Sequence, residues 1–151
     1  DQQGRVLGMH QGIGHFTVGQ RKGLNVASPR PLYVLRIEVA TNRLVVGPEE
    51  ELYSDGLVAS QVCYVSGRAP PPGTHVTAKI RYRSPEVDAV LYPEGEKAWV
   101  RFQQPQKAVT PGQNVVLYAG EEVLGGGIIE SPLSEEELSR RCFWGERGGV
   151  P

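Results

Sequence analysis

Short runs of β-branched and aromatic residues recur along this chain, and glycine, proline or asparagine stands between most of them. Such runs favour β-strands, and the residues between them favour tight turns. The pattern predicts strands at residues 32–39, 43–47, 57–65, 75–82, 87–92, 98–102, 115–118 and 123–124. Six or more short strands at roughly even spacing indicate an all-β fold, either a small closed or partly open β-barrel or a sandwich.

The strand predicted at residues 75–82 has a clear alternation of apolar and polar side chains. Alternate side chains of a strand point to opposite faces, so one face is apolar and the other is basic. The apolar face holds Val76, Ala78, Ile80 and Tyr82, and the other face holds Thr77, Lys79, Arg81 and Arg83. Strict alternation would send Tyr82 into the core, whereas a break at the strand end before Pro85 would leave it outside. Two neighbouring guanidinium groups need an anion between them, either a phosphate or the carboxylates of Glu86 and Asp88. The residues alone favour neither.

The loop at residues 19–23 combines glycines with two cations. Gly19 and Gly23 allow backbone conformations in which a Cβ would clash. Between them lie the side-chain amide of Gln20 and the charges of Arg21 and Lys22. Backbone N–H groups and cations in such a loop can converge on a phosphate. A solvated turn between two strands is the alternative.

Gln113 follows the turn sequence Thr110-Pro111-Gly112 and precedes a predicted strand. Its side-chain amide can both donate and accept, so it could bind a ribose hydroxyl or the edge of a base. The alternative is a hydrogen bond to its own turn.

Other motifs indicate structure rather than chemistry. The triplet Gly125-Gly126-Gly127 lacks the spacing of a phosphate-binding loop, so we predict a β-bulge or a close backbone crossing there. Cys63 lies in an apolar strand, which predicts a buried thiol used for packing. The histidines and cysteines lack the spacing of a zinc site, and we expect no metal and no catalytic residue in this chain.

The last 20 residues differ from the rest. Ser134 and Glu137 have the spacing of a capping box, in which each side chain bonds to a backbone N–H near the start of a helix. We therefore predict one short helix of about two turns after residue 134. Phe143 and Trp144 follow it and could pack back on the strands.

The charge is unevenly distributed. The formal net charge is −1, whereas a generic nucleic-acid-binding protein is basic overall. Residues 1–107 hold 13 basic and 10 acidic side chains, and residues 108–151 hold 3 and 7, which is compatible with a modest basic side. Two distant cysteines suit a reducing compartment, and no apolar run approaches the ~20 residues of a membrane span. We expect a cytoplasmic protein that does not bind membranes.

Five stretches of the chain, in this order, resemble the tRNA-specific 2-thiouridylases of bacteria and organelles, the MnmA/TrmU family. They are Gly8–Gly12, His15–Leu24, Lys79–Arg83, Ala108–Gln113 and Leu124–Glu130. The resemblance covers residues 4–130 and concerns the C-terminal region of the family. It implies that the N-terminal ATP-pyrophosphatase domain, with its nucleophilic cysteine and partner cysteine, lies outside this chain.

The resemblance implies three parts. Residues 1–28 are the end of the family's central domain with the loop at residues 19–23, residues 29–131 are a barrel like those of translation factors, and residues 132–151 are an extension with the short helix. The expected role is to hold tRNA so that the wobble uridine of the anticodon reaches the catalytic domain. That domain would use ATP, Mg and persulfide sulfur to make 2-thiouridine, and this chain alone would bind no cofactor and carry out no catalysis.

The candidate tRNA contacts combine the resemblance with the residue chemistry. They are Arg81, Tyr82, Arg83, Gln113, Gln20, Arg21 and Lys22. The loop at residues 19–23 could instead hold the catalytic domain. Expected partners are tRNA, that domain and a sulfur-carrier protein. The alternative function is a non-catalytic barrel that binds another protein, such as a subunit of a split enzyme or a sulfur carrier.

Overall fold

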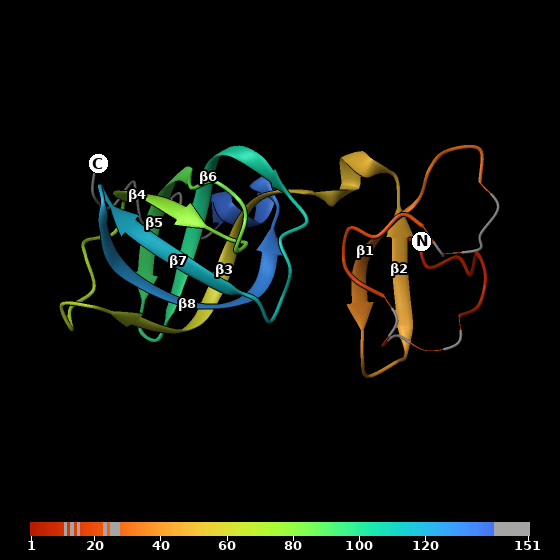
Figure 1. Cartoon of the computed structure of the whole chain (residues 1–151), viewed down its shortest axis with the longest axis horizontal. Coiled ribbons are helices and arrows are strands. Elements are labelled where there is room, and N and C mark those ends of the chain that lie inside the picture. The colour runs from red at the N-terminus through yellow and green to blue at the C-terminus, as the bar shows by residue number, and fades with distance from the viewer. Residues whose placement is uncertain (11, 13, 15, 23, 25–27, 141–151) are drawn as a thin grey trace. The chain divides into compact units, whose positions relative to one another are not determined.

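The computed structural model describes residues 1–10, 12, 14, 16–22, 24 and 28–140. Contacts between Cα atoms divide the chain into two compact units, Asp1–Tyr53 and Ser54–Pro151. One sheet has two strands, and the other closes into a barrel (Figure 1).

The first unit contains an antiparallel hairpin of β1, Tyr33–Glu38, and β2, Arg43–Gly47. The predicted turn is present: the N–H of Asn42 donates to the carbonyl of Val39 at 3.2 Å, and Asn42 has a φ of 55°. A short 3₁₀ helix, η2, follows at Glu49–Leu52. The hairpin lies in the first unit and outside the barrel, whereas the barrel domain expected from the resemblance begins at residue 29.

The second unit is the predicted all-β barrel, closed by strands in the order β3-β6-β5-β4-β7-β8. The strands are β3 (Tyr53–Tyr64), β4 (Thr74–Lys79), β5 (Val87–Glu94), β6 (Lys97–Lys107), β7 (Asn114–Ala119) and β8 (Glu122–Leu133). Their inward side chains form one core, which includes Leu57, Val76, Ala78, Leu91, Val100, Val115, Leu117 and Ile129. Burial of each large aliphatic side chain stabilises the fold by about 1.5–3 kcal/mol.

The triplet Gly125–Gly127 brings β8 close to the backbone of β3. A Cβ on Gly125 would lie 2.3 Å from the carbonyl oxygen of Cys63, and one on Gly127 would lie 2.8 Å from that of Ser60. The β3–β8 register shifts between Ser60 and Cys63. The triplet is therefore a close backbone crossing, as the sequence predicts.

Residues 135–140 are helical, and the predicted capping box is present. The N–H of Glu137 donates to Oγ of Ser134 at 3.3 Å, and the N–H of Ser134 donates to the Glu137 carboxylate at 3.2 Å. Leu138 is fully buried against the outward-facing side chains of Val58 and Tyr92. The predicted packing of Phe143 and Trp144 concerns residues outside the described range.

Candidate nucleic-acid interface

The basic motif after β4 lies in a turn rather than in a strand. β4 ends at Lys79, and the N–H of Ser84 donates to the carbonyl of Arg81 at 3.2 Å to close the turn. The prediction that Arg81 and Arg83 share one strand face is therefore wrong. Strict alternation would have buried Tyr82, but this side chain is 87% exposed, as expected if alternation breaks before Pro85. Alternation holds only to Ile80, which is buried, because the chain then turns ahead of Pro85.

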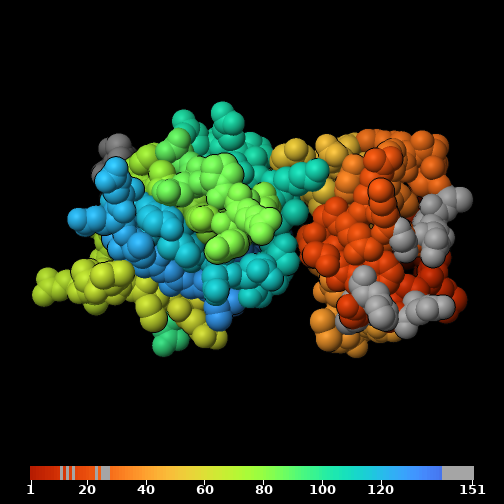
Figure 2. All heavy atoms as spheres, in the orientation of Figure 1, coloured from red at the N-terminus to blue at the C-terminus, as the bar shows by residue number. Residues whose placement is uncertain are grey.

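Arg81 joins this turn to the connection between β6 and β7. Its Nε donates to Oγ of Ser84 at 2.9 Å. Its Nη1 donates to the carbonyl oxygen of Lys107 and, at 3.3 Å, to that of Ala108. Figure 2 shows the segment after β4, in lime green, beside the turquoise β6–β7 connection on the same face.

The connection from Ala108 to Gln113 is itself ordered by hydrogen bonds. Oγ1 of Thr110 donates to the Ala108 carbonyl at 2.9 Å, and the N–H of Gln113 donates to the Thr110 carbonyl at 3.2 Å. The carbonyl of Gln113 accepts from the N–H of Ile129 at 2.8 Å. The backbone of Gln113 thus forms the turn, while its exposed side-chain amide bonds to no other described residue.

Strand pairing places Gln113 and the turn after β4 at the same end of the barrel. β4 pairs with β7 antiparallel, and the last pair is Lys79 with Val116. The end of β4 and the start of β7, which Gln113 precedes, therefore lie at the same end of the barrel. The structure therefore brings four predicted contacts, Arg81, Tyr82, Arg83 and Gln113, to one end of the barrel.

One cation at this end was not selected from the sequence. Nζ of Lys79 lies 5.8 Å from the centroid of the Tyr82 ring, within cation–π range. Its place at the start of the Lys79–Arg83 motif is the signal that could have identified it. The carboxylates of Glu86 and Asp88 lie near other partners, the Thr77 hydroxyl and the His75 ring. Among the described residues, neither carboxylate pairs with Arg81 or Arg83.

The other three predicted contacts belong to the first unit. The Gln20 side chain braces its own turn, because its Oε1 accepts from the N–H of Thr17 at 3.0 Å and its Nε2 donates to the carbonyl of Lys22 at 2.8 Å. Gly19 has the predicted left-handed backbone, with a φ of 92°. Arg21 and Lys22 are exposed, and their side chains bond to no described residue. These two cations, and not the amide, are therefore available to a ligand.

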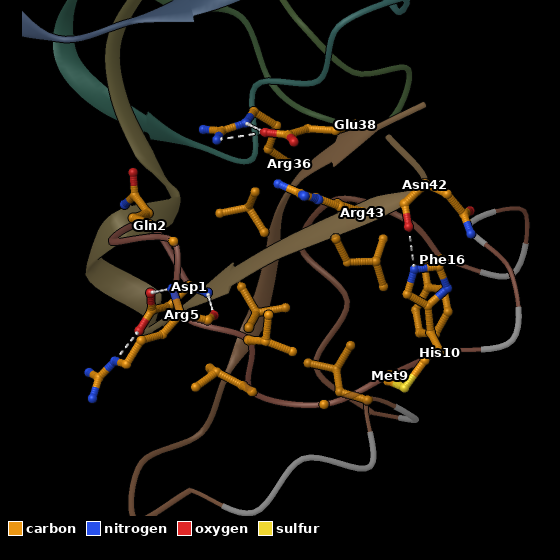
Figure 3. A pocket seen from close by; sticks show the side chains of 18 residues that line it. Asp1, Gln2, Arg5, Met9, His10, Phe16, Arg36, Glu38, Asn42 and Arg43 are labelled. Carbon is orange, nitrogen blue, oxygen red and sulfur yellow. Dashed lines mark hydrogen bonds and ion pairs between the residues drawn. The ribbon is translucent and has the colours of Figure 1, made fainter. Parts of the chain in front are cut away.

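The first unit also has a pocket of about 400 Å³ beneath the hairpin (Figure 3). Nε2 of His10 donates to the carbonyl of Asn42 at 2.9 Å, and the His10 ring packs edge-on against Phe16. At the rim, a hydrogen bond from Arg36 holds the pKa of Glu38 below its ordinary value. Gln20, Arg21 and Lys22 do not line this pocket, so these three residues of the loop at residues 19–23 are separate from it.

Three further findings concern the thiol of Cys63, metal ligands and membrane-spanning helices. Cys63 is exposed, so the prediction of a buried packing thiol is wrong; the register shift next to it takes its side chain out of the barrel core. Within residues 1–10, 12, 14, 16–22, 24 and 28–140, no group of three or more histidine, cysteine, aspartate or glutamate residues could hold a metal ion. In the same ranges, no helix is long and apolar enough to cross a membrane.

Comparison with known families gives two matches. A model described as the aminomethyltransferase beta-barrel domain matches residues 54–129. A model described as the tRNA methyl transferase PRC-barrel domain matches residues 1–48. The boundary between the matches coincides with the division into two units after Tyr53.

Curated relatives carry a more specific description. The chain is 54% identical over 133 residues to the tRNA-specific 2-thiouridylase MnmA of Synechococcus sp. (strain JA-3-3Ab). The aligned residues cover 87% of this chain and 36% of that protein. It is 50% identical over 131 residues to the protein of the same description from Acetivibrio thermocellus, covering 86% and 36%. The chain thus spans about a third of the length of these relatives.

Proposed function

The chain belongs to the tRNA-specific 2-thiouridylase family and matches its C-terminal region, and we propose that it binds tRNA and positions it for sulfur transfer. The modified atom in this proposal belongs to the uridine at the anticodon wobble position, and the product is 2-thiouridine. Sulfur transfer itself occurs in a catalytic domain that this chain does not include. Positioning of this kind can lower the barrier of a bimolecular reaction by several kcal/mol.

The observation that carries the proposal is the cluster at the end of β4. An exposed aromatic ring, an exposed guanidinium and an exposed amide lie on two segments that hydrogen bonds hold together. Arg83 can bind a phosphate, the face of Tyr82 can stack on an unpaired base, and Gln113 can bind a ribose hydroxyl or a base edge. These are the three contacts by which proteins bind single-stranded loops of RNA.

Arg21 and Lys22 supply a second set of cations in the first unit. Because both side chains are free of other described residues, each can neutralise one phosphate without breaking an existing bond. In the proposal they bind tRNA rather than the catalytic domain. Gln20 keeps the loop in shape instead of contacting RNA.

The rest of the reaction lies outside this chain. We propose that the catalytic domain takes ATP and Mg, and that a sulfur-carrier protein supplies the persulfide sulfur that is found in 2-thiouridine. The setting is the cytoplasm. This chain contributes binding and orientation of the RNA, and its own residues carry no step of the chemistry.

A salt titration of tRNA binding tests the proposal. Each lost phosphate contact should reduce the magnitude of the slope of log K against log [salt] by about 0.7–0.9. We expect Arg83→Ala to do so, and Arg21→Ala likewise. Arg68 is a matched control, since its exposed side chain makes no bond to described residues and it lies in the β3–β4 connection, at the other end of β4.

We expect Arg68→Ala to leave the slope unchanged. Equal slopes for the wild type, Arg83→Ala and Arg68→Ala would contradict the proposed interface. Binding that is insensitive to salt, with tight association to another protein, would favour the protein-interaction function instead.

A further inference from the structure

We propose that Lys79 is a further tRNA-binding residue, which holds one face of the Tyr82 ring and neutralises a phosphate beside the base that stacks on the other face. This inference rests on the proposed function and deepens it. It adds to the end of β4 a cation that is not among the candidate contacts selected from the sequence.

The strand β4 determines where the Lys79 side chain points. Lys79 is the last residue of the strand, and its neighbours Ala78 and Ile80 are buried. Because alternate side chains point to opposite faces, Lys79 lies on the outer face of the barrel together with Thr77. Its backbone is held by pairing with Val116 of β7. The side chain is half-buried, as expected where an aliphatic stem lies along the barrel and the ammonium group reaches water.

The ammonium group lies over the ring of Tyr82. Nζ of Lys79 is 5.8 Å from the ring centroid, a distance at which a cation is attracted to the face of an aromatic ring. This contact occupies one of the two faces. Tyr82 is 87% exposed, so the other face is open to a ligand. A contact that favours one orientation of an exposed ring reduces the entropy that is lost when a base stacks on it.

The charge of Lys79 is not neutralised by a carboxylate of the described protein. Glu86 accepts a hydrogen bond from the hydroxyl of Thr77 at 2.6 Å, and no ion pair joins it to Lys79. Among the described residues, Lys79 forms no hydrogen bond, so its three N–H donors are available to a phosphate. Lys97, by contrast, pairs with Glu130 at 3.1 Å.

The ring and the ammonium group suit one nucleotide of a single strand. A nucleotide carries its phosphate beside its base, so a base stacked on Tyr82 brings a phosphate to the same surface. Proteins bind single-stranded nucleic acids through aromatic rings that stack on bases and cations that follow the backbone. Lys79 contributes to both contacts, because it orders the ring and carries a free charge next to it.

The first experiment measures the binding of the full chain to a tRNA without modified bases over a salt series. Lys79→Met keeps the apolar stem and removes the charge. We expect it to weaken binding about tenfold and to reduce the magnitude of the salt slope by about 0.7–0.9. Lys79→Arg keeps a cation over the ring, so it should bind within about twofold of the wild type with the full slope.

Lys97→Met is the matched control. Lys97 begins β6 beside the β5–β6 turn, which lies at the opposite end of the barrel because β4, β5 and β6 are antiparallel neighbours. We expect this variant to keep the full slope. Equal losses in Lys79→Met and Lys97→Met, or unchanged binding in Lys79→Met, would overturn the inference. A smaller slope in Arg83→Ala would uphold the proposed function in either case.

A double-mutant cycle tests whether Lys79 acts together with Tyr82. Tyr82→Leu removes the aromatic face and should itself weaken binding by roughly tenfold. In the Tyr82→Leu background, Lys79→Met should cost at least about threefold less than in the wild type, because only the phosphate contact remains to be lost. Equal costs in the two backgrounds would show that the ammonium group does not act through the ring and would overturn the inference.

The third experiment needs no RNA and keeps the inference separate from the proposed function. Protons above an aromatic face are shifted upfield by the ring current. In the NMR spectrum of the free chain, the ε-CH₂ signals of Lys79 should therefore lie upfield of those of Lys97 and move back in Tyr82→Leu. Equal positions for the two lysines would overturn the inference even if the chain binds tRNA. Shifted signals in a chain that binds no tRNA would reject the proposed function and, with it, the RNA-binding role of Lys79.

Discussion

At the scale of single residues, glycine has two unrelated purposes in the β7–β8 hairpin. Gly120 lies in the turn with a φ of 66°, and a Cβ there would meet nothing within 4 Å. Gly125 has no such backbone requirement, but a Cβ there would lie 2.3 Å from the carbonyl oxygen of Cys63. The first position needs glycine for its conformation, and the second needs it for space.

These two purposes predict different costs for alanine. Gly125→Ala must push two backbones apart, and overpacking of this kind costs about 3 kcal/mol of unfolding free energy. Gly120→Ala strains only its own backbone, at about 1 kcal/mol. Urea denaturation of both variants, monitored by circular dichroism, measures the difference. If Gly125→Ala is no more costly than Gly120→Ala, the close crossing of β3 and β8 is wrong.

Single residues of β4 follow the alternation of the strand only as far as the strand extends. Alternation correctly places Val76, Ala78 and Ile80 in the core, because that pattern is set by the pleat of the strand itself. It does not extend to Arg81 and Tyr82. Pro85 indicates that alternation can break near this point, but a strand ends where its hydrogen-bonding neighbours end, and the sequence does not display those neighbours. The partners of Arg81 are backbone carbonyls 26 and 27 residues away, which no local pattern reveals.

At the scale of elements, the helix after β8 illustrates how local and distant signals combine. The capping box of Ser134 and Glu137 could be predicted from the sequence because both residues lie within one turn. The tertiary contacts of the helix could not be predicted in this way. Asp55 of β3 accepts from the N–H of Glu135 at 2.9 Å, and Glu135 pairs with Arg101 of β6. The helix is therefore bonded to both β3 and β6.

Gly56 marks the place where this helix meets the barrel. A Cβ there would lie 3.0 Å from the methyl carbons of Leu138 and 2.3 Å from the carbonyl oxygen of Val100. The absence of a side chain at this position leaves room for Leu138 over the junction of β3 and β6. The helix thus packs where two strands distant in sequence come together.

This packing predicts a large effect for one side chain of the helix. Leu138 is fully buried, so Leu138→Ala should lower the free energy of unfolding by about 3 kcal/mol through lost burial and a residual cavity. Ser134→Ala removes the cap and should cost about 1 kcal/mol. Ser139 is exposed on the same helix, and Ser139→Ala should stay within about 0.5 kcal/mol of the wild type. Chemical denaturation that ranks Leu138→Ala with Ser139→Ala would mean that the helix does not pack on the barrel.

The strands of the hairpin of β1 and β2 follow from the sequence pattern, whereas the unit to which the hairpin belongs does not. Its strands and turn were predictable, because β-branched runs flank Thr41-Asn42 and the pairing is local. Its membership in the first unit was not, since any hairpin with an apolar face can pack on either side of a domain boundary. Backbone hydrogen bonds join the hairpin to the first unit. Val34 accepts from the N–H of Gly19 and donates to the carbonyl of Gln20, both in the loop at residues 19–23.

At the scale of the whole molecule, the two units bring different parts of the proposed RNA contact. The barrel carries Arg83, Tyr82 and Gln113, and the first unit carries Arg21 and Lys22. The net charge of −1 does not predict whether either group of residues binds RNA, because electrostatic binding depends on where cations are free rather than on their total number. Most acidic side chains of the barrel unit lie outside the β4–β5 turn and the β6–β7 connection.

Separate cores predict that the barrel unit folds without the first. Residues 54–151 have a closed sheet and a continuous apolar interior, and their length lies within the usual range of a domain. We expect this segment to unfold in one cooperative transition by circular dichroism and to bind tRNA with a smaller salt slope than the full chain, because Arg21 and Lys22 are missing. Arg83→Ala within the segment should reduce the slope by a further 0.7–0.9, approximately. A segment that unfolds without cooperativity would reject the division after Tyr53, whereas a cooperative segment with the full slope would remove Arg21 and Lys22 from the interface.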